Sequence, residues 1–224
     1  MNLLRQAGLI ARKDLTIEIR GRYGLAAVLP FAVTLLVTFG LSLGPGRTLL
    51  ETIAPGLLWL AVLFASVLAF RQAYQSEGED GALDGLVLSP VDRAAIFLGK
   101  GAAVAAQLLV LEVTVILLVT ALFGLSVGEE LAPLAAAFVL GTIGLAAVGS
   151  LFGAVSESPR AREGVFPLLV LPLATPVLVA GVKATELAAQ GRGAEAASWL
   201  GLLVAFDLVV VSVGTLVFGY LLED

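Results

Sequence analysis

The chain has 224 residues, of which 59% are hydrophobic and 14% charged, with a formal net charge of −5 and no histidine or cysteine. Average soluble domains are about 45–50% apolar and about 25% charged, so this composition, with a mean hydropathy of +1.02, excludes an ordinary soluble domain. The missing residue types exclude disulfides, thiol catalysis and histidine-ligated metals, and the acidic balance argues against a nucleic-acid partner.

The first 22 residues mix basic and apolar side chains. On a helical wheel one face gathers Leu3, Leu4, Ala7, Ala11, Leu15 and Ile19, and Arg5, Arg12, Lys13 and Arg20 point away from it. We expect residues 2–22 to form an amphipathic interfacial helix with its basic face toward lipid headgroups. A plain charged tail is the alternative, because Asp14 and Glu18 interrupt the apolar face.

Six apolar windows follow, each near the roughly 20 residues that span a hydrocarbon core of about 30 Å. They are residues 23–43, 52–70, 101–124, 131–155, 165–182 and 198–222, in which the only charged residues are Glu112 and Asp207. The pattern predicts an all-α, polytopic integral membrane protein with six transmembrane helices, forming a single domain over residues 1–224.

Lysine and arginine indicate the orientation in the membrane. They are concentrated in the N-terminal arm and in the connections after the second and fourth windows, whereas the opposite side holds only Arg47, Lys183 and Arg192. By the positive-inside rule both termini are expected in the cytoplasm.

The connection 71–100 is cytoplasmic in this orientation and carries two predicted helix starts. Ser76 and Glu79 have capping-box spacing. In Ser89-Pro90-x-Asp92 we expect Ser89 as the cap, Pro90 as the first and Asp92 as the third residue of a helix that runs into the third span. The short helix between them would carry an apolar stripe of Leu83, Leu86 and Val87 flanked by acids. We expect it to dock on a soluble partner rather than fold back on the bilayer, because anionic lipid repels the acids.

The two intramembrane acids have no basic residue in any window to pair with. Because an ionised acid at mid-span costs about 2.5–3.5 kcal/mol, we expect Glu112 and Asp207 to be neutral and to hydrogen-bond to a hydroxyl or a backbone carbonyl. Two roles stay open: a proton or substrate relay, and a neutral contact between helices.

Small residues and prolines distinguish the fourth and fifth windows. Gly141, Gly144, Gly149 and Gly153 predict close helix packing within the chain rather than between copies. The fifth window contains Pro167, Pro172 and Pro176, which predict a kinked or interrupted helix and are candidate hinges.

Three stretches resemble the haem exporter protein B family of the cytochrome c maturation system. They are Ile53-Ala54-Pro55-Gly56-Leu57-Leu58-Trp59, the run from Glu79 through Pro90 that leads to Gly99-Lys100, and Leu171-Pro172-Leu173-Ala174-Thr175-Pro176. The likeness extends over the whole chain in length and span order. The acidic run is also found in the wider class of ABC-2-type permeases.

This resemblance implies a non-catalytic permease subunit of an ABC transporter in a bacterial inner membrane. The implied partners are a separate ABC ATPase subunit that holds ATP, a second copy of the chain, haem-handling membrane subunits and a periplasmic haem chaperone. The residues that would couple to the ATPase are Glu79, Asp80, Gly81, Leu83, Asp84, Leu86, Val87, Ser89 and Pro90. The sequence contains no Walker loop, in agreement with this role, since Gly99-Lys100 is followed by glycine.

Haem iron takes histidine, cysteine, methionine or tyrosine ligands, and only Met1, Tyr23, Tyr74 and Tyr220 are present. None is a convincing ligand, so we expect a partner to ligate haem and this chain to bind no cofactor or metal directly. Two alternatives stay open: an ABC-2-type exporter of another substrate, such as a lipid or drug, and a proton-coupled secondary transporter that uses Glu112 and Asp207.

Overall fold

The computed structural model describes residues 2–21, 23–44, 46–80, 91–125, 130–155 and 159–221, and these form α-helices without a strand. The helices are α1 (Leu3–Gly21), α2 (Tyr23–Leu43), α3 (Arg47–Asp80), α5 (Arg93–Phe123), α6 (Leu131–Val155), α7 (Pro159–Ala189) and α8 (Gly193–Leu221). Within these ranges the predicted all-α fold is confirmed.

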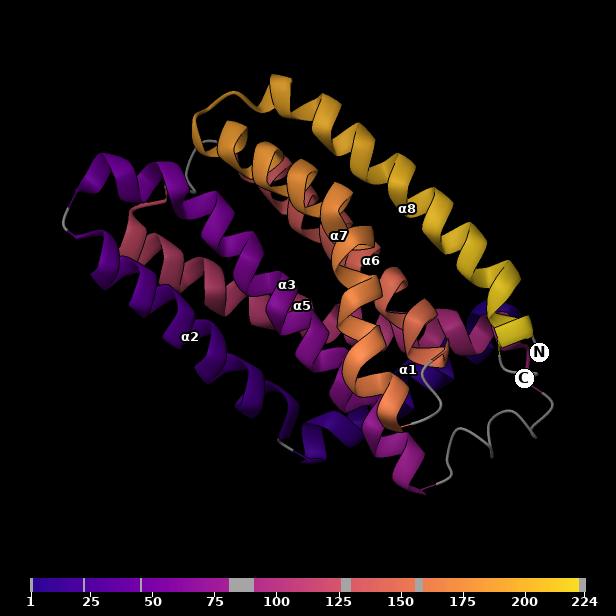
Figure 1. Cartoon of the computed structure of the whole chain (residues 1–224). Coiled ribbons are helices and arrows are strands. Elements are labelled where there is room, and N and C mark those ends of the chain that lie inside the picture. Colours follow the sequence, from indigo (N-terminus) through magenta and orange to yellow (C-terminus); the bar gives the residue numbers. More distant parts are fainter. Residues whose placement is uncertain are drawn as a thin grey trace.

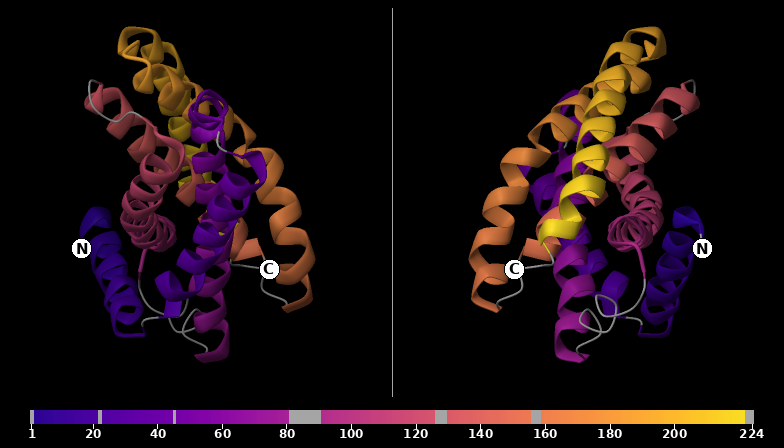
Figure 2. Two further views of the ribbon diagram at one scale, coloured as in Figure 1. Left: turned by 90° about the vertical axis from the view of Figure 1, so that its left-hand side faces the viewer. Right: turned by 90° about the vertical axis from the view of Figure 1, so that its right-hand side faces the viewer.

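Helices α2 to α8 run up and down in one bundle, with α2 and α8 at opposite edges (Figure 1). One end of the bundle holds the C-terminal ends of α2, α5 and α7 and the starts of α3, α6 and α8, and we call it the turn end. The opposite end of the bundle, which we call the α1 end, holds α1, the starts of α5 and α7 and the C-terminal end of α8. Both chain termini lie at the α1 end (Figures 1 and 2).

Five of the described helices are long and apolar enough to cross a membrane: Arg47–Phe70, Arg93–Phe123, Leu131–Leu151, Val170–Ala189 and Gly193–Gly219. Helix α2 contributes a shorter apolar stretch, Leu29–Leu43, so the sixth predicted span stays a prediction. Large aliphatic side chains project from the bundle surface, among them Leu117, Leu208 and Leu216, which are 65%, 65% and 73% exposed. Such a surface needs lipid around it, because monomeric soluble proteins rarely expose extensive apolar patches.

Several helices extend beyond the predicted windows, because oppositely charged residues within the same helix pair with each other there. Helix α3 begins with Arg47, whose Nε donates to Glu51 Oε1 at 2.9 Å. Near the end of α7, Lys183 Nζ lies 2.8 Å from Glu186 Oε2. Pairs three or four residues apart lie on one helix face and stabilise it, so a charge that closes an apolar window need not end the helix.

Buried apolar side chains form two connected cores. The larger includes Trp59 and joins α2, α3, α5, α6, α7 and α8. The smaller lies toward the α1 end, where Phe70, Phe97 and Phe218 from three helices meet Ile10 of α1. Helix α6 packs against α5, α7 and α8, so it contributes to both cores.

Glycines of α6 pack against other helices of the same chain, as predicted. At Gly149 a β-carbon would overlap the ring of Phe70 on α3, and at Gly141 it would overlap the ring of Trp59. Gly153 has no described side-chain surroundings. The small residues of α6 therefore let aromatic rings of α3 reach its backbone.

We expect Gly149→Ala to lower the free energy of unfolding by about 1–3 kcal/mol, because the added methyl group forces the Phe70 ring or the backbone to move. Gly201→Ala is the matched control, since Gly201 lies in α8 with no neighbouring atom within 4 Å of the added carbon. Thermal denaturation in detergent micelles compares the two. Equal midpoints for both variants would show that the packing at Gly149 is loose.

Candidate functional site

The predicted coupling residues lie where α3 leaves the bundle at the α1 end. Glu79 and Asp80 are the last two residues of α3, while Gly81, Leu83, Asp84, Leu86, Val87, Ser89 and Pro90 lie outside the described residues. The helix start predicted at Ser76 is wrong, because α3 is continuous from Arg47 to Asp80. Propagating an existing helix adds one hydrogen bond per residue, whereas a new start leaves the first N–H groups unpaired.

The start of α5 also differs from the prediction. Asp92 is the N-cap rather than the third residue of the helix, and its Oδ1 accepts a hydrogen bond from the Ala94 N–H at 3.0 Å. The window predicted to begin at residue 101 therefore starts at Arg93, and Lys100 belongs to α5 instead of a loop. Ten residues, 81–90, separate the end of α3 from the first described residue before α5.

Helix α1 packs along the first turns of α5 (Figure 2). Ala7 and Ile10 are buried there, and a β-carbon at Gly99 would lie 2.7 Å from Ile10 Cβ and 2.8 Å from the Ala7 carbonyl oxygen. The face predicted to lie on the membrane is only partly buried, because Leu4 and Ile19 remain 73% and 76% exposed. Part of this apolar face contacts α5 instead of lipid. A helical wheel identifies an apolar face but does not distinguish contact with protein from contact with lipid.

Polar contacts fasten α1 to α5 at two points. The Gln6 side-chain oxygen accepts a hydrogen bond from the backbone N–H of Asp92 at 3.1 Å. Lys100 is 3% exposed and its Nζ lies 3.8 Å from Asp14 Oδ2, while the other oxygen of Asp14 lies 2.9 Å from Lys13 Nζ. Sequence reasoning missed this contact, because it treated Asp14 as a defect of the apolar face and Lys100 as a loop charge.

Glu112 of α5 is buried and meets α6. Its Oε1 accepts a hydrogen bond from the hydroxyl of Thr142 at 2.6 Å, which confirms the predicted type of partner. Its Oε2 has no hydrogen-bond partner among the described residues. The neutral form of the carboxyl is the one such a site accommodates, because a buried ionised oxygen without partners is costly.

Asp207 of α8 is 7% exposed, and neither of its carboxyl oxygens has a hydrogen-bond partner among the described residues. The hydrogen bond predicted for Asp207 is therefore not found in the part of the chain that the structure describes. The carboxyl faces the backbone of α6, where a β-carbon on Gly144 would lie 2.7 Å from Oδ1. Gly144 leaves space for the Asp207 carboxyl on α6 but has no side chain that could donate or accept a hydrogen bond.

Glu112 of α5 and Asp207 of α8 both contact α6, but at different residues of it. Thr142, which meets Glu112, and Gly144, which meets Asp207, are two residues apart on that helix. Residues two apart on an α-helix point in directions about 200° apart. The two acids therefore contact different sides of α6, and a relay between them has no direct step through it.

We expect Thr142→Val to lower the free energy of unfolding by about 1–3 kcal/mol, because it leaves a buried Glu112 oxygen without its donor. Thr142→Ser keeps the hydroxyl and is expected to cost less. Adding Glu112→Leu to Thr142→Val should recover part of the loss, because both polar partners are then gone. Thermal denaturation of the three variants tests this, and equal effects of valine and serine would contradict it.

The prolines of the fifth window lie within one continuous helix, α7 (Figure 1). An interruption at Pro167, Pro172 or Pro176 is thus not observed, and the hinge role stays a prediction. The neighbouring helices supply packing on the inner face, since Val170, Ala174 and Val177 are buried. Packing by neighbours permits proline inside a membrane helix that would break in isolation.

A buried contact around Trp59 was also missed. Its indole N–H donates to the Thr185 hydroxyl of α7 at 2.9 Å, and its ring stacks on Phe138 of α6 with centroids 5.5 Å apart. The sequence marks Trp59 only as the end of an apolar motif, because the pairing of residues 126 positions apart leaves no local signal.

Comparison with known proteins identifies relatives for nearly the whole chain. A family model described as CcmB protein matches residues 5–223. The chain is similar to Heme exporter protein B of Pseudomonas aeruginosa, with 33% identity over 190 residues, covering 83% of each chain. Heme exporter protein B of Bradyrhizobium diazoefficiens is 28% identical over 208 residues, covering 92% of this chain and 91% of the relative. That of Paracoccus denitrificans is 33% identical over 186 residues, or 80% and 82%.

Proposed function

The chain belongs to the CcmB family, and on that premise we propose that it is the membrane subunit of an ABC transporter that handles haem for cytochrome c maturation. In this proposal a separate ATPase subunit binds and hydrolyses ATP. The present chain forms a single permease domain, acts with a second copy, and converts nucleotide-driven movement into rearrangement of the membrane complex. Haem-handling membrane subunits and a periplasmic haem chaperone complete the system.

The continuity of α3 and α5 is the observation that best supports a mechanical role. Helix α3 contains the apolar stretch Arg47–Phe70 and extends unbroken to Asp80, and α5 begins at Arg93. The segment 81–90 is thus joined on both sides to helices long enough to span the membrane. A force applied to this segment reaches two such helices without passing through a long flexible linker.

Besides α3 and α5, helix α1 is a third helix that would respond to movement of residues 81–90. Because Gln6 holds the backbone of Asp92, and Asp14 lies beside Lys100, α1 moves with the start of α5. Displacement of residues 81–90 by an ATPase would therefore shift α1, α3 and α5 together. A packed bundle responds to such a shift by changing between discrete packings rather than by bending continuously.

Copurification with an ABC ATPase and measurement of its ATP hydrolysis test the coupling role. We expect Leu83→Asp and Leu86→Asp to weaken the complex and uncouple ATP hydrolysis from accumulation of c-type cytochromes. Leu208→Asn is a control for a polar substitution on the exposed face of α8, away from the segment. If the wild-type chain matures cytochromes without any ATPase, or if Leu83→Asp leaves coupling unchanged, the proposal fails.

We further propose that the chain has six spans with α1 at the membrane interface, in a bacterial inner membrane, and that the α1 end faces the cytoplasm. The absence of native cysteine permits labelling of single introduced cysteines without background. A membrane-impermeant maleimide should label Gln190→Cys at the turn end of intact spheroplasts. Asn2→Cys at the α1 end should react only after lysis, and the reverse pattern would invert the orientation.

Iron ligation is assigned in this proposal to a partner subunit. The side chains of Met1, Tyr23, Tyr74 and Tyr220 lie outside the described part of the structure, so the proposal rests on their residue types and places in the chain. The purified chain should show no haem absorbance with a defined axial ligand, and haem should appear only with the haem-handling subunits. A stable haem spectrum in the isolated chain would overturn this assignment.

A further inference from the structure

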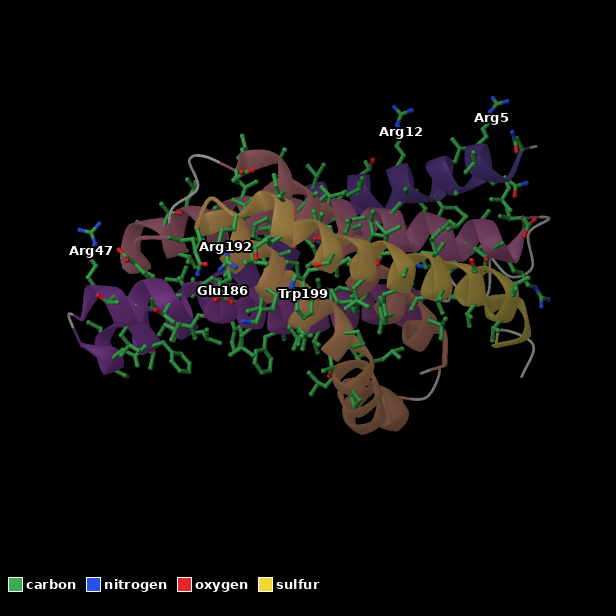
Figure 3. The ribbon with its side chains drawn as sticks, turned by 90° about the horizontal axis from the view of Figure 1, so that it is seen from above. Arg5, Arg12, Arg47, Glu186, Arg192 and Trp199 are labelled. Atoms are coloured by element: carbon green, nitrogen blue, oxygen red, sulfur yellow. The ribbon has the colours of Figure 1, made fainter. Side chains whose placement is uncertain are left out.

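A cavity of about 400 Å³ opens at the turn end of the bundle, and none of its lining residues belongs to the segment 81–90. Its walls come from the part of α3 between Arg47 and Pro55, from Gly124 and Leu125 after α5, and from the last turn of α7 with the adjoining Gln190. Arg47 and Glu186, which belong to these walls, lie at the same end of the molecule in Figure 3. The volume is within the roughly 300–1,000 Å³ of small-molecule sites.

The lining of the cavity is rich in hydrogen-bond acceptors. The carboxylates of Glu51 on α3 and Glu186 on α7 line the cavity, with side chains 45% and 33% exposed. One oxygen of each pairs with a basic side chain, Oε1 of Glu51 with Arg47 and Oε2 of Glu186 with Lys183, and the second oxygen of each is the acceptor that remains. Pro55 has no N–H, so the carbonyl of Glu51 loses its α-helical donor at the cavity wall. Gln190 adds a side-chain amide. A group that carries several N–H donors and a positive charge fits these acceptors.

Arg47 and the start of α3 also suit the cavity to an anion. Arg47 is 85% exposed, and its Nε contacts Glu51 while the rest of the guanidinium remains available for a second partner. Arg47 and Thr48 form the first turn of α3, where unpaired backbone N–H groups and the helix dipole favour negative charge. The C-terminal turn of α7, with the opposite dipole, contributes Glu186, and Gln190 follows directly after the helix. The cavity therefore presents positive and negative groups next to each other.

The depth of the cavity points to the kind of zwitterion. It lies where the apolar stretches Arg47–Phe70 and Val170–Ala189 end, which is the level of lipid headgroups, and Pro55 and Leu125 form apolar parts of its lining. We propose that it binds the phosphoethanolamine headgroup of phosphatidylethanolamine, with the ammonium between Glu51 and Glu186 and the phosphate at Arg47. Phosphatidylcholine carries the same charges, but its trimethylammonium has no N–H to donate.

Native mass spectrometry and thermal denaturation in nanodiscs of matched lipid composition test the proposal. We expect the chain to bind phosphatidylethanolamine about tenfold more tightly than phosphatidylcholine, as expected from one charge-assisted hydrogen bond. Glu51→Gln/Glu186→Gln should reduce this preference to less than twofold, and Arg47→Gln should weaken both lipids equally. Equal binding of the two lipids by the native chain would overturn the proposal, as would a preference that survives the double substitution.

Glu195→Gln is the matched control, because Glu195 lies at the same end, pairs with Arg192 and does not line the cavity. It should leave the preference unchanged. If the double variant fails to fold, Glu186→Gln alone should still reduce the preference severalfold. Soluble phosphoethanolamine added to detergent-solubilised protein distinguishes a free zwitterion from a lipid: strong competition at micromolar concentration would assign the site to the soluble molecule. The site requires neither haem nor an ATPase, so its failure and that of the proposed function are separable.

Discussion

Trp59→Ala is expected to lower the free energy of unfolding by about 3–5 kcal/mol, the cost typical of removing a large buried aromatic side chain. Trp59 is fully buried and contacts two other helices: the Phe138 ring and Gly141 on α6, and the Thr185 hydroxyl and Gly181 on α7. A β-carbon at Gly181 would lie 2.5 Å from the indole, so the surrounding backbone is shaped around this side chain. The cavity left by alanine cannot collapse without moving whole helices.

Two substitutions separate the contributions of the ring and of its N–H. Trp59→Phe retains an aromatic ring but leaves the Thr185 hydroxyl without this donor, and should cost less than alanine. Trp199→Ala is the matched control, because Trp199 is the only other tryptophan and is only partly buried. Thermal denaturation should rank the midpoints as Trp199→Ala, Trp59→Phe and Trp59→Ala in falling order. A Trp59→Ala variant as stable as Trp199→Ala would refute the account.

Asp14→Asn is expected to lower the free energy of unfolding by about 3 kcal/mol and to loosen α1 from α5. It removes a counter-charge from Lys100, whose side chain is 4% exposed, and breaking a buried pair on one side costs roughly 3–5 kcal/mol. The partial exposure of Asp14 puts the effect at the lower end of this range. Because α1 also holds Asp92, which follows residues 81–90 in the chain, the proposed function predicts that the variant loses coupling to ATP hydrolysis as well.

A second substitution should reverse the effect of the first. Asp14→Asn/Lys100→Met removes both charges and keeps an unbranched side chain at position 100, so stability should return to within about 1 kcal/mol of the native chain. Lys13→Ala removes only the outer partner of Asp14 and should change stability by less than about 1 kcal/mol. Protease sensitivity of α1, together with the denaturation midpoint, measures these effects. If Asp14→Asn were no worse than Lys13→Ala, the buried contact would not hold α1.

Sequence reasoning succeeded where a property is repeated along a helix. An apolar stretch such as 131–155 predicts a helix by its length and composition, and α6 has exactly these bounds. Boundaries failed where a charge was taken as an end: Arg47 and Arg93 begin helices that already belong to the apolar stretches, because their charges are satisfied by neighbours or at the helix start. Arg93, for example, donates from Nη1 to the carbonyl of Gly219 at 2.7 Å.

The candidate site shows the same division. The kind of partner expected for Glu112 followed from the cost of a charge at mid-span, and a hydroxyl is present. The same reasoning failed for Asp207, because whether a donor stands opposite an acid depends on which helix face packs there. The contact between Asp14 and Lys100 was equally invisible, since both residues had local explanations that did not involve each other.

The sequence alone determined that this protein is a helical membrane protein. The length and the hydrophobicity of a helix depend on residues that are neighbours in the chain, and contacts with distant residues do not change them. The sequence also determined the family, through motifs distributed over the whole chain. The tertiary structure alone decided that α1 binds α5, that Trp59 meets Thr185, and that three distant segments enclose a cavity at the turn end. The physical reason is that lipid imposes the same apolar requirement on every outward face, so only the packing of one helix on another selects which residues meet.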